Sequence, residues 1–111
     1  MEKPRDIHIG VPYYLEFESD QEELQLDADT TMVCIYIPTQ NKRYLANVTN
    51  KPDEPGVVVA GWSADDTSNM APTTIVLEVY KTQGEEIVDI LYRKESFAGI
   101  KRVSVSPGVK Q

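Results

Sequence analysis

Histidine, cysteine and tryptophan are nearly absent from this sequence: the 111 residues include one of each. A single cysteine, Cys34, excludes a disulfide within the chain. A thiol nucleophile needs a base beside it, and His8 is the sole histidine, so we expect Cys34 to be a small buried residue and not a catalytic one. Zinc requires three or four nitrogen or sulfur ligands, which these two residues cannot supply. The sequence therefore predicts no enzyme activity and no catalytic residues.

Basic residues are also scarce. Eleven lysines and arginines against 18 aspartates and glutamates give a formal net charge of −7. Nucleic-acid backbones and anionic membranes are bound through clustered basic side chains, so neither is expected as a partner. No apolar run reaches the roughly 18–20 residues of a membrane span, and the first ten residues lack the apolar segment of a signal peptide. We expect a protein made and folded inside a cell, with a solvated acidic surface.

Long helical patterns are missing, whereas short runs of alternating apolar and polar residues are frequent. Residues 13–18, 31–37, 43–49 and 86–95 alternate with the period of two that half-buried strands show. Turn residues separate such runs about every 8–12 residues, which is the spacing of a β-sandwich. We therefore predict an all-β fold, an immunoglobulin-like β-sandwich of about seven to nine short strands, with a small barrel as the alternative.

The domain boundaries follow from composition. Residues 1–6 are polar and predict an N-terminal arm, and residues 107–111, beyond the last alternating run, predict a C-terminal tail. Residues 7–106 between them form the predicted sandwich domain. Within that domain, residues 7–10 and residues 24–26 are candidates for short additional strands.

Residues 56–80 hold two β-prone runs on either side of a short helix signal. Ser63 is placed to cap the N-terminus of a helical turn, and Asp66 follows three residues later, as in a capping box. We predict that this turn covers residues 64–68. Trp62, at the end of the first β-prone run, is assigned to the core.

Acidic residues gather in the expected loops, where β-sandwiches can hold calcium through oxygen ligands. They are Asp27, Asp29, Asp53, Glu54, Asp65 and Asp66. Residues 27–30 lack the later ligand positions of a calcium loop, and helix capping explains Asp65 and Asp66. No pair of acids can be placed around a cleft, as glycoside hydrolysis would need. We predict no metal site and no cofactor.

Tyrosine is the most frequent aromatic residue, with six copies on the expected strands. Both faces of residues 31–37 are apolar, so this strand is expected to be central or to carry an interface on its second face. Tyrosine is enriched at protein interfaces. The residues that we predict to line contacts with other proteins are Tyr13, Tyr14, Tyr36, Tyr44 and Tyr92.

Residues 56–80 contain an S-A-D-D-T turn followed by a strand of the form T-x-x-L-E-V-Y. This pattern resembles the N-terminal immunoglobulin-like modules of tailed-phage structural proteins, such as upper baseplate proteins and fibre-attachment domains. The opening D-I-H-I-G-V-P-Y-Y-L-E-F is similar to the start of such modules, and the hairpin of residues 33–48 falls where they place their second pair of strands. The chain departs from the pattern at residues 71–73, Ala-Pro-Thr, where these modules usually have a glycine.

The resemblance implies a non-enzymatic structural protein of a virus particle: a capsid decoration, head-fibre, collar or baseplate component. The implied location is the virion and the implied partners are other virion structural proteins, with a homo-oligomer as a further option. Docking would use apolar strand faces, strand edges and the ordering of the arm and tail on contact. The alternative is a carbohydrate- or ligand-binding sandwich in which an exposed Trp62 and neighbouring loop acids form the binding platform.

Overall fold

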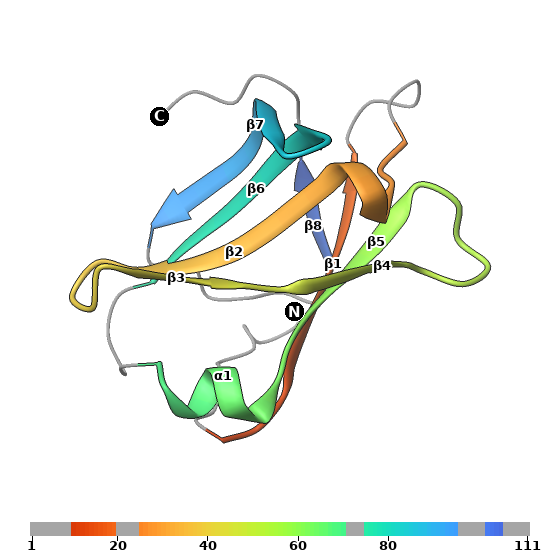
Figure 1. Ribbon diagram of the computed structural model, residues 1–111. Coiled ribbons are helices and arrows are strands. Elements are labelled where there is room, and N and C mark those ends of the chain that lie inside the picture. Colours follow the sequence, from red (N-terminus) through yellow and green to blue (C-terminus); the bar gives the residue numbers. More distant parts are fainter. Residues whose placement is uncertain (1–9, 20–24, 71–74, 96–101, 106–111) are drawn as a thin grey trace.

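The computed structural model describes residues 10–19, 25–70, 75–95 and 102–105, which form an all-β sandwich (Figure 1). These residues contain eight strands: β1 (Tyr13–Ser19), β2 (Thr31–Ile37), β3 (Lys42–Leu45), β4 (Asn47–Asn50), β5 (Val57–Trp62), β6 (Val76–Gln83), β7 (Glu86–Glu95) and β8 (Arg102–Val105). They lie in two four-stranded sheets. The predicted β-sandwich of seven to nine short strands is confirmed.

One sheet has the strand order β4-β5-β1-β8 and the other has the order β3-β2-β6-β7. Neighbouring strands are antiparallel except β1 and β8, which are parallel. β3 pairs with β2, whereas β4 pairs with β5 in the other sheet, and Ala46 is the single residue between them. The sequence predicts one strand over residues 43–49, and the structure divides that segment between the two sheets (Figure 1).

The core lies between the sheets and is built from the inward positions of each strand. In β1, Leu15 and Phe17 are buried while Tyr14 is exposed, as the alternation predicts. Trp62 is 1% exposed, which confirms its assignment to the core. Its indole Nε1 donates a hydrogen bond of 2.8 Å to the backbone carbonyl of Tyr44, so this polar group is satisfied inside the apolar interior.

Two of the predicted contact residues, Tyr13 and Tyr44, belong to this core and are each 5% exposed. The Tyr13 ring packs against Trp62 with a centroid separation of 5.8 Å. The Tyr44 hydroxyl donates to the carbonyl of Asn69 at 2.8 Å. A tyrosine can be buried when its hydroxyl finds a partner, so the prediction that these two rings line contacts with other proteins is wrong.

The predicted helical turn is present as α1 (Ala64–Ser68). Ser63 is its N-cap, and its Oγ accepts a hydrogen bond of 3.1 Å from the backbone N–H of Asp66. Thr67 is fully buried and donates to the carbonyl of Val11 at 3.0 Å. This bond attaches the helix to the segment that leads into β1.

Other expectations fall partly or wholly outside the described residues. These are the arm at residues 1–6, the tail at residues 107–111, residues 7–9 of the possible strand at 7–10, and Leu24 of the run at 24–26. Leu26 is buried but lies in no strand. Its backbone N–H donates instead to the carbonyl of Gly56, 3.3 Å away.

We expect Trp62→Phe to lower the free energy of unfolding by about 1–3 kcal/mol, because the buried Tyr44 carbonyl loses its donor and the smaller ring leaves a void. Chemical denaturation followed by circular dichroism measures the change, since the variant has no tryptophan fluorescence. Tyr14→Phe is the control at an exposed ring and should stay within about 0.5 kcal/mol of the parent. If Trp62→Phe is equally stable, neither the hydrogen bond nor the packing stabilises the fold.

Candidate docking faces

The outward side chains of the two sheets differ in chemistry. The outward side of the β3-β2-β6-β7 sheet is here called the arginine face. Cross-strand pairing places on it Met32, Cys34, Tyr36, Arg43, Leu45, Val76, Glu78, Tyr80 and Arg93. Cys34, Val76 and Glu78 are buried beneath the other side chains of this face. The other sheet carries a groove, here called the Tyr14 groove, lined by Tyr14, Asn47, Thr49, Val59, Gly61, Trp62 and Ser63. Sequence reasoning identified members of both surfaces but neither arrangement.

Glu78 of β6 is the centre of the arginine face, and its side chain is 1% exposed. Its Oε1 accepts from Arg43 Nε and its Oε2 from Arg93 Nε, both at 2.9 Å. The Cys34 thiol also donates to Oε1, at 3.3 Å. The strand register produces this cluster, because β6 places Glu78 directly between Cys34 of β2 and Arg93 of β7.

These contacts fix the charge states in the cluster. Burial alone would raise the pKa of Glu78, but hydrogen bonds from Arg43 and the other donors outweigh it, so its pKa lies below the ordinary value. Burial, reinforced by Glu78, raises the pKa of Cys34 to about 12. The same two causes raise the pKa of Tyr80 to about 12. At neutral pH the carboxylate is therefore ionised while the thiol and the phenol keep their protons.

The two arginines that bind this buried carboxylate are themselves partly exposed to solvent. The side chain of Arg43 is 52% exposed, and its guanidinium carbon lies 4.3 Å from the centroid of the Tyr36 ring. Arg93 is 24% exposed. Both use Nε to bind Glu78, and within the described part of the chain no hydrogen bond engages their terminal amino groups. The cluster therefore holds two partly exposed cations in fixed positions.

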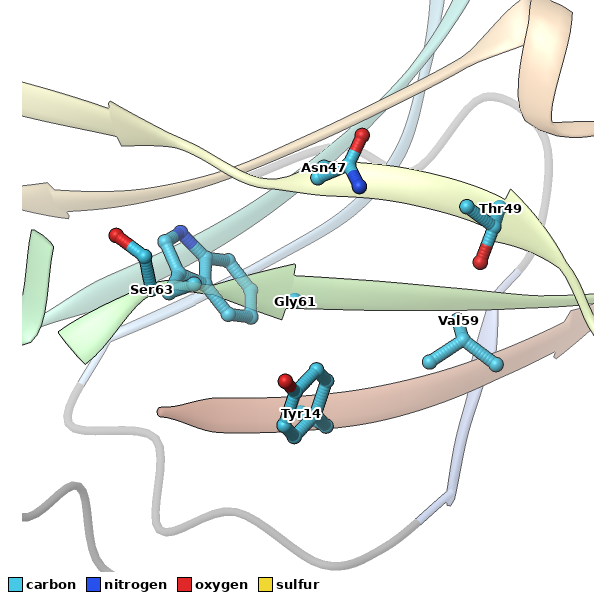
Figure 2. Close-up of a pocket in the computed structure, with 7 residues that line it drawn as sticks. Tyr14, Asn47, Thr49, Val59, Gly61 and Ser63 are labelled. Atoms are coloured by element: carbon cyan, nitrogen blue, oxygen red, sulfur yellow. The ribbon is translucent and has the colours of Figure 1, made fainter. Parts of the chain in front are cut away.

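The Tyr14 groove has a volume of about 210 Å³ and crosses three neighbouring strands (Figure 2). Tyr14 of β1, Gly61 of β5 and Asn47 of β4 are paired across the sheet. The Tyr14 ring lies so close to Gly61 that a Cβ there would approach its Cε1 to 2.8 Å. A glycine is therefore needed where the ring rests on the sheet. Thr49 of β4 extends the polar side of the groove, as Figure 2 shows.

The predicted contact residues are distributed over different surroundings. Tyr14 is 55% exposed in the groove, Tyr36 is half-buried on the arginine face, and Tyr92 is half-buried and packs against the core. Trp62 contributes to the wall of the groove although it is almost completely buried. A carbohydrate platform built on an exposed Trp62 is thus contradicted by its burial.

Sequence reasoning missed the Glu78 cluster. A signal was present, because Glu78 is a charged residue at an outward position between Val76 and Tyr80 in the apolar first part of β6. Arg43 lies 35 positions before Glu78 and Arg93 lies 15 positions after it, so only the pairing of β2, β3, β6 and β7 shows that the three side chains meet.

Metal ligation finds no support in the described residues, where no group of three His, Cys, Asp or Glu side chains could hold an ion. Asp27 caps the short 3₁₀ turn Ala28–Thr30 by accepting from the backbone N–H of Asp29 at 3.1 Å.

None of the helices in the described ranges has the length and apolarity to cross a membrane. No protein-family model, curated protein or solved structure matches this chain.

The dependence of the free energy of unfolding on acid pH should reveal the contribution of the Glu78 cluster to stability. Because the folded pKa of Glu78 lies below its ordinary value of 4.5, its ionised form stabilises the fold above that pH, and the contribution is lost as pH falls through the folded pKa. We expect Glu78→Gln to destabilise the protein at pH 7 by about 1–3 kcal/mol and to flatten the decline of stability below about pH 5.

The matched control is Glu54→Gln, at a carboxylate that is 40% exposed and pairs with Lys51 at 3.0 Å. Exposed ion pairs contribute about 0–1 kcal/mol, so this variant should follow the parent closely. Urea denaturation at a series of pH values measures both. A Glu78→Gln variant with the same acid profile as the parent would contradict the assignment.

Proposed function

We propose that this chain is a non-enzymatic assembly module, a small β-sandwich that docks on other structural proteins of a tailed-phage virion. The virion location and the choice among capsid decoration, head-fibre, collar and baseplate follow from the sequence resemblance. The observation that carries the docking proposal is the arginine face, with Arg43 and Arg93 held in place by a buried Glu78.

The composition of this face supports docking. Tyrosine, arginine and methionine are enriched at protein interfaces, and arginine and tyrosine are frequent among the residues that dominate binding energy. Leu45 is 59% exposed and lies opposite Cys34 in the strand pairing, beside the cluster. An exposed leucine next to oriented arginines offers a partner one apolar contact and two cations.

Rigidity favours binding as well. Ordering a flexible side chain at an interface costs about 0.5–1.5 kcal/mol. Arg43 is already held from two sides, by Glu78 and by the Tyr36 ring, and the Tyr36 hydroxyl donates to Asn41 Oδ1 at 3.1 Å. Part of that cost is therefore met during folding. A partner that fits this face presents a carboxylate to the free guanidinium donors of Arg43 and Arg93.

The chemistry of the described side chains agrees with binding. The groups in the cluster that could act as nucleophiles are the Cys34 thiol and the Tyr80 phenol, and both have a pKa of about 12. Since the reactive form of either group is its anion, neither is activated at neutral pH. We therefore assign the cluster to orientation of the arginines.

The proposal is tested by purifying phage particles from a culture that expresses the gene and asking whether the chain is part of them. We expect the chain to sediment with the particles at a fixed copy number and to remain after washing at moderate salt, as mass spectrometry of the banded particles measures. If the chain stays in the particle-free fraction although particles form, the virion assignment is wrong.

The arginine face is tested by Leu45→Asn, which removes an exposed apolar contact. Because Leu45 is exposed, the isolated fold should change by no more than about 0.5 kcal/mol. We expect the particle-bound fraction to fall about tenfold, equivalent to about 1.4 kcal/mol. Ile87→Asn is the matched control, at a residue that is 52% exposed near the β6–β7 turn and pairs with Thr82, four positions along β6 from Glu78. Equal loss in both variants would place docking elsewhere.

A further inference from the structure

The Tyr14 groove lies on the sheet opposite the arginine face and is not used by the proposed docking. Its polar groups are available: within the described residues, no side chain bonds the Tyr14 hydroxyl, the Asn47 amide or the Thr49 hydroxyl. Ser63 accepts from the Asp66 N–H, which leaves its own hydroxyl proton free to donate. Three polar side chains, Asn47, Thr49 and Ser63, therefore lie around the exposed ring of Tyr14, which carries a hydroxyl of its own.

The floor of the groove is apolar and defined by packing. The Tyr14 ring rests against Gly61 while 55% of the residue remains exposed. Val59 continues the floor along β5, and Trp62 adds an edge from the core. Figure 2 shows Asn47 and Thr49 on β4 and Tyr14 on β1, on either side of β5. The ring thus forms one wall and the β4 side chains form the other.

We propose that the Tyr14 groove binds a neutral sugar ring. A pyranose has an apolar face of C–H groups that can pack on an aromatic ring, and its hydroxyls both donate and accept hydrogen bonds. An amide and three hydroxyls, as found here, can do the same. This arrangement of an apolar surface with a few polar groups is what small-molecule sites share.

Size and charge narrow the ligand class. Sites for drug-sized ligands measure about 300–1,000 Å³, whereas this groove measures about 210 Å³ and suits a single ring or the end of a glycan. Among the described residues that line it, none is basic. Glu16 lies two residues after Tyr14 on the same face of β1 and already pairs with Lys51 at 3.0 Å. Phosphate-bearing ligands are therefore disfavoured, because the groove offers them no positive charge. A neutral sugar needs none.

Gly61 has a specific role in this site, because it determines where the ring lies. An alanine there would place its Cβ 2.8 Å from Cε1 and 2.9 Å from Cδ1 of Tyr14. Since Tyr14 is exposed, its ring can move away without disturbing the core. Gly61→Ala should therefore alter the groove while leaving the fold intact.

The test is an NMR titration of the full chain with the methyl glycosides of glucose, galactose, mannose and N-acetylglucosamine. We expect at least one of them to shift the backbone resonances of the groove residues with a dissociation constant of about millimolar size. Tyr14→Ala and Gly61→Ala should each weaken that binding at least about tenfold, which corresponds to about 1.4 kcal/mol. Val88→Ala, an exposed control in β7, should bind as the parent does.

The proposal is overturned if none of the four sugars shifts the groove at about 50 mM, well above a millimolar dissociation constant. It is also overturned if binding survives both groove substitutions. The spectra of the variants verify their fold in the same experiment. Particle docking and sugar binding use opposite sheets and separate assays, so failure of one leaves the other measurable.

Discussion

The hydrogen bond from Trp62 Nε1 to the carbonyl of Tyr44 joins the two sheets next to the point where the chain passes from β3 to β4. Trp62 ends β5 of one sheet, and Tyr44 belongs to β3 of the other. Between β3 and β4, the backbone N–H of Ala46 donates to the carbonyl of Val33 at 2.9 Å. These two bonds satisfy the backbone where the chain passes from one sheet to the other. Without them, the transition would leave polar groups unpaired inside an apolar core.

The sheet transition also explains why the two outer faces differ. One sheet receives β3, whose outward residue Arg43 meets the carboxylate of Glu78. The other receives β4, whose outward residues Asn47 and Thr49 are neutral and polar. A segment of nine residues thus supplies an ionic side chain to one surface and uncharged hydrogen-bonding groups to the opposite surface. The different ligands proposed for the two surfaces follow from this division.

Placement of Glu78 outside the core is consistent with the cost of burying charge. An ionised carboxylate between the sheets would lack partners, whereas at an outward position the stems of Arg43 and Arg93 can cover it and their Nε groups can bind it. Within the described residues, every buried side-chain nitrogen or oxygen has a hydrogen-bond partner. The low exposure of Glu78 is thus accompanied by hydrogen bonds that satisfy both of its carboxylate oxygens.

The sequence allowed a correct prediction of the strands because alternation is a local property. The burial of Leu15 and Phe17, the helical turn after Ser63 and the core position of Trp62 could all be read from neighbouring residues. Tyr44 was harder to place. The alternation put Tyr44 on the same side as Ala46 and Val48, yet we predicted it at a protein contact. The carbonyl that accepts from its buried hydroxyl belongs to a residue 25 positions away.

What the sequence determined by itself was the all-β class, the approximate number of strands and which face of most strands is apolar. Those features depend on periods of a few residues. What the tertiary structure decided was the split of residues 42–50 between the sheets, the meeting of Arg43 and Arg93 at Glu78, and the support of Tyr14 by Gly61. These depend on which strands become neighbours and in what register. That choice is made by packing of the whole core, so no local stretch of sequence records it.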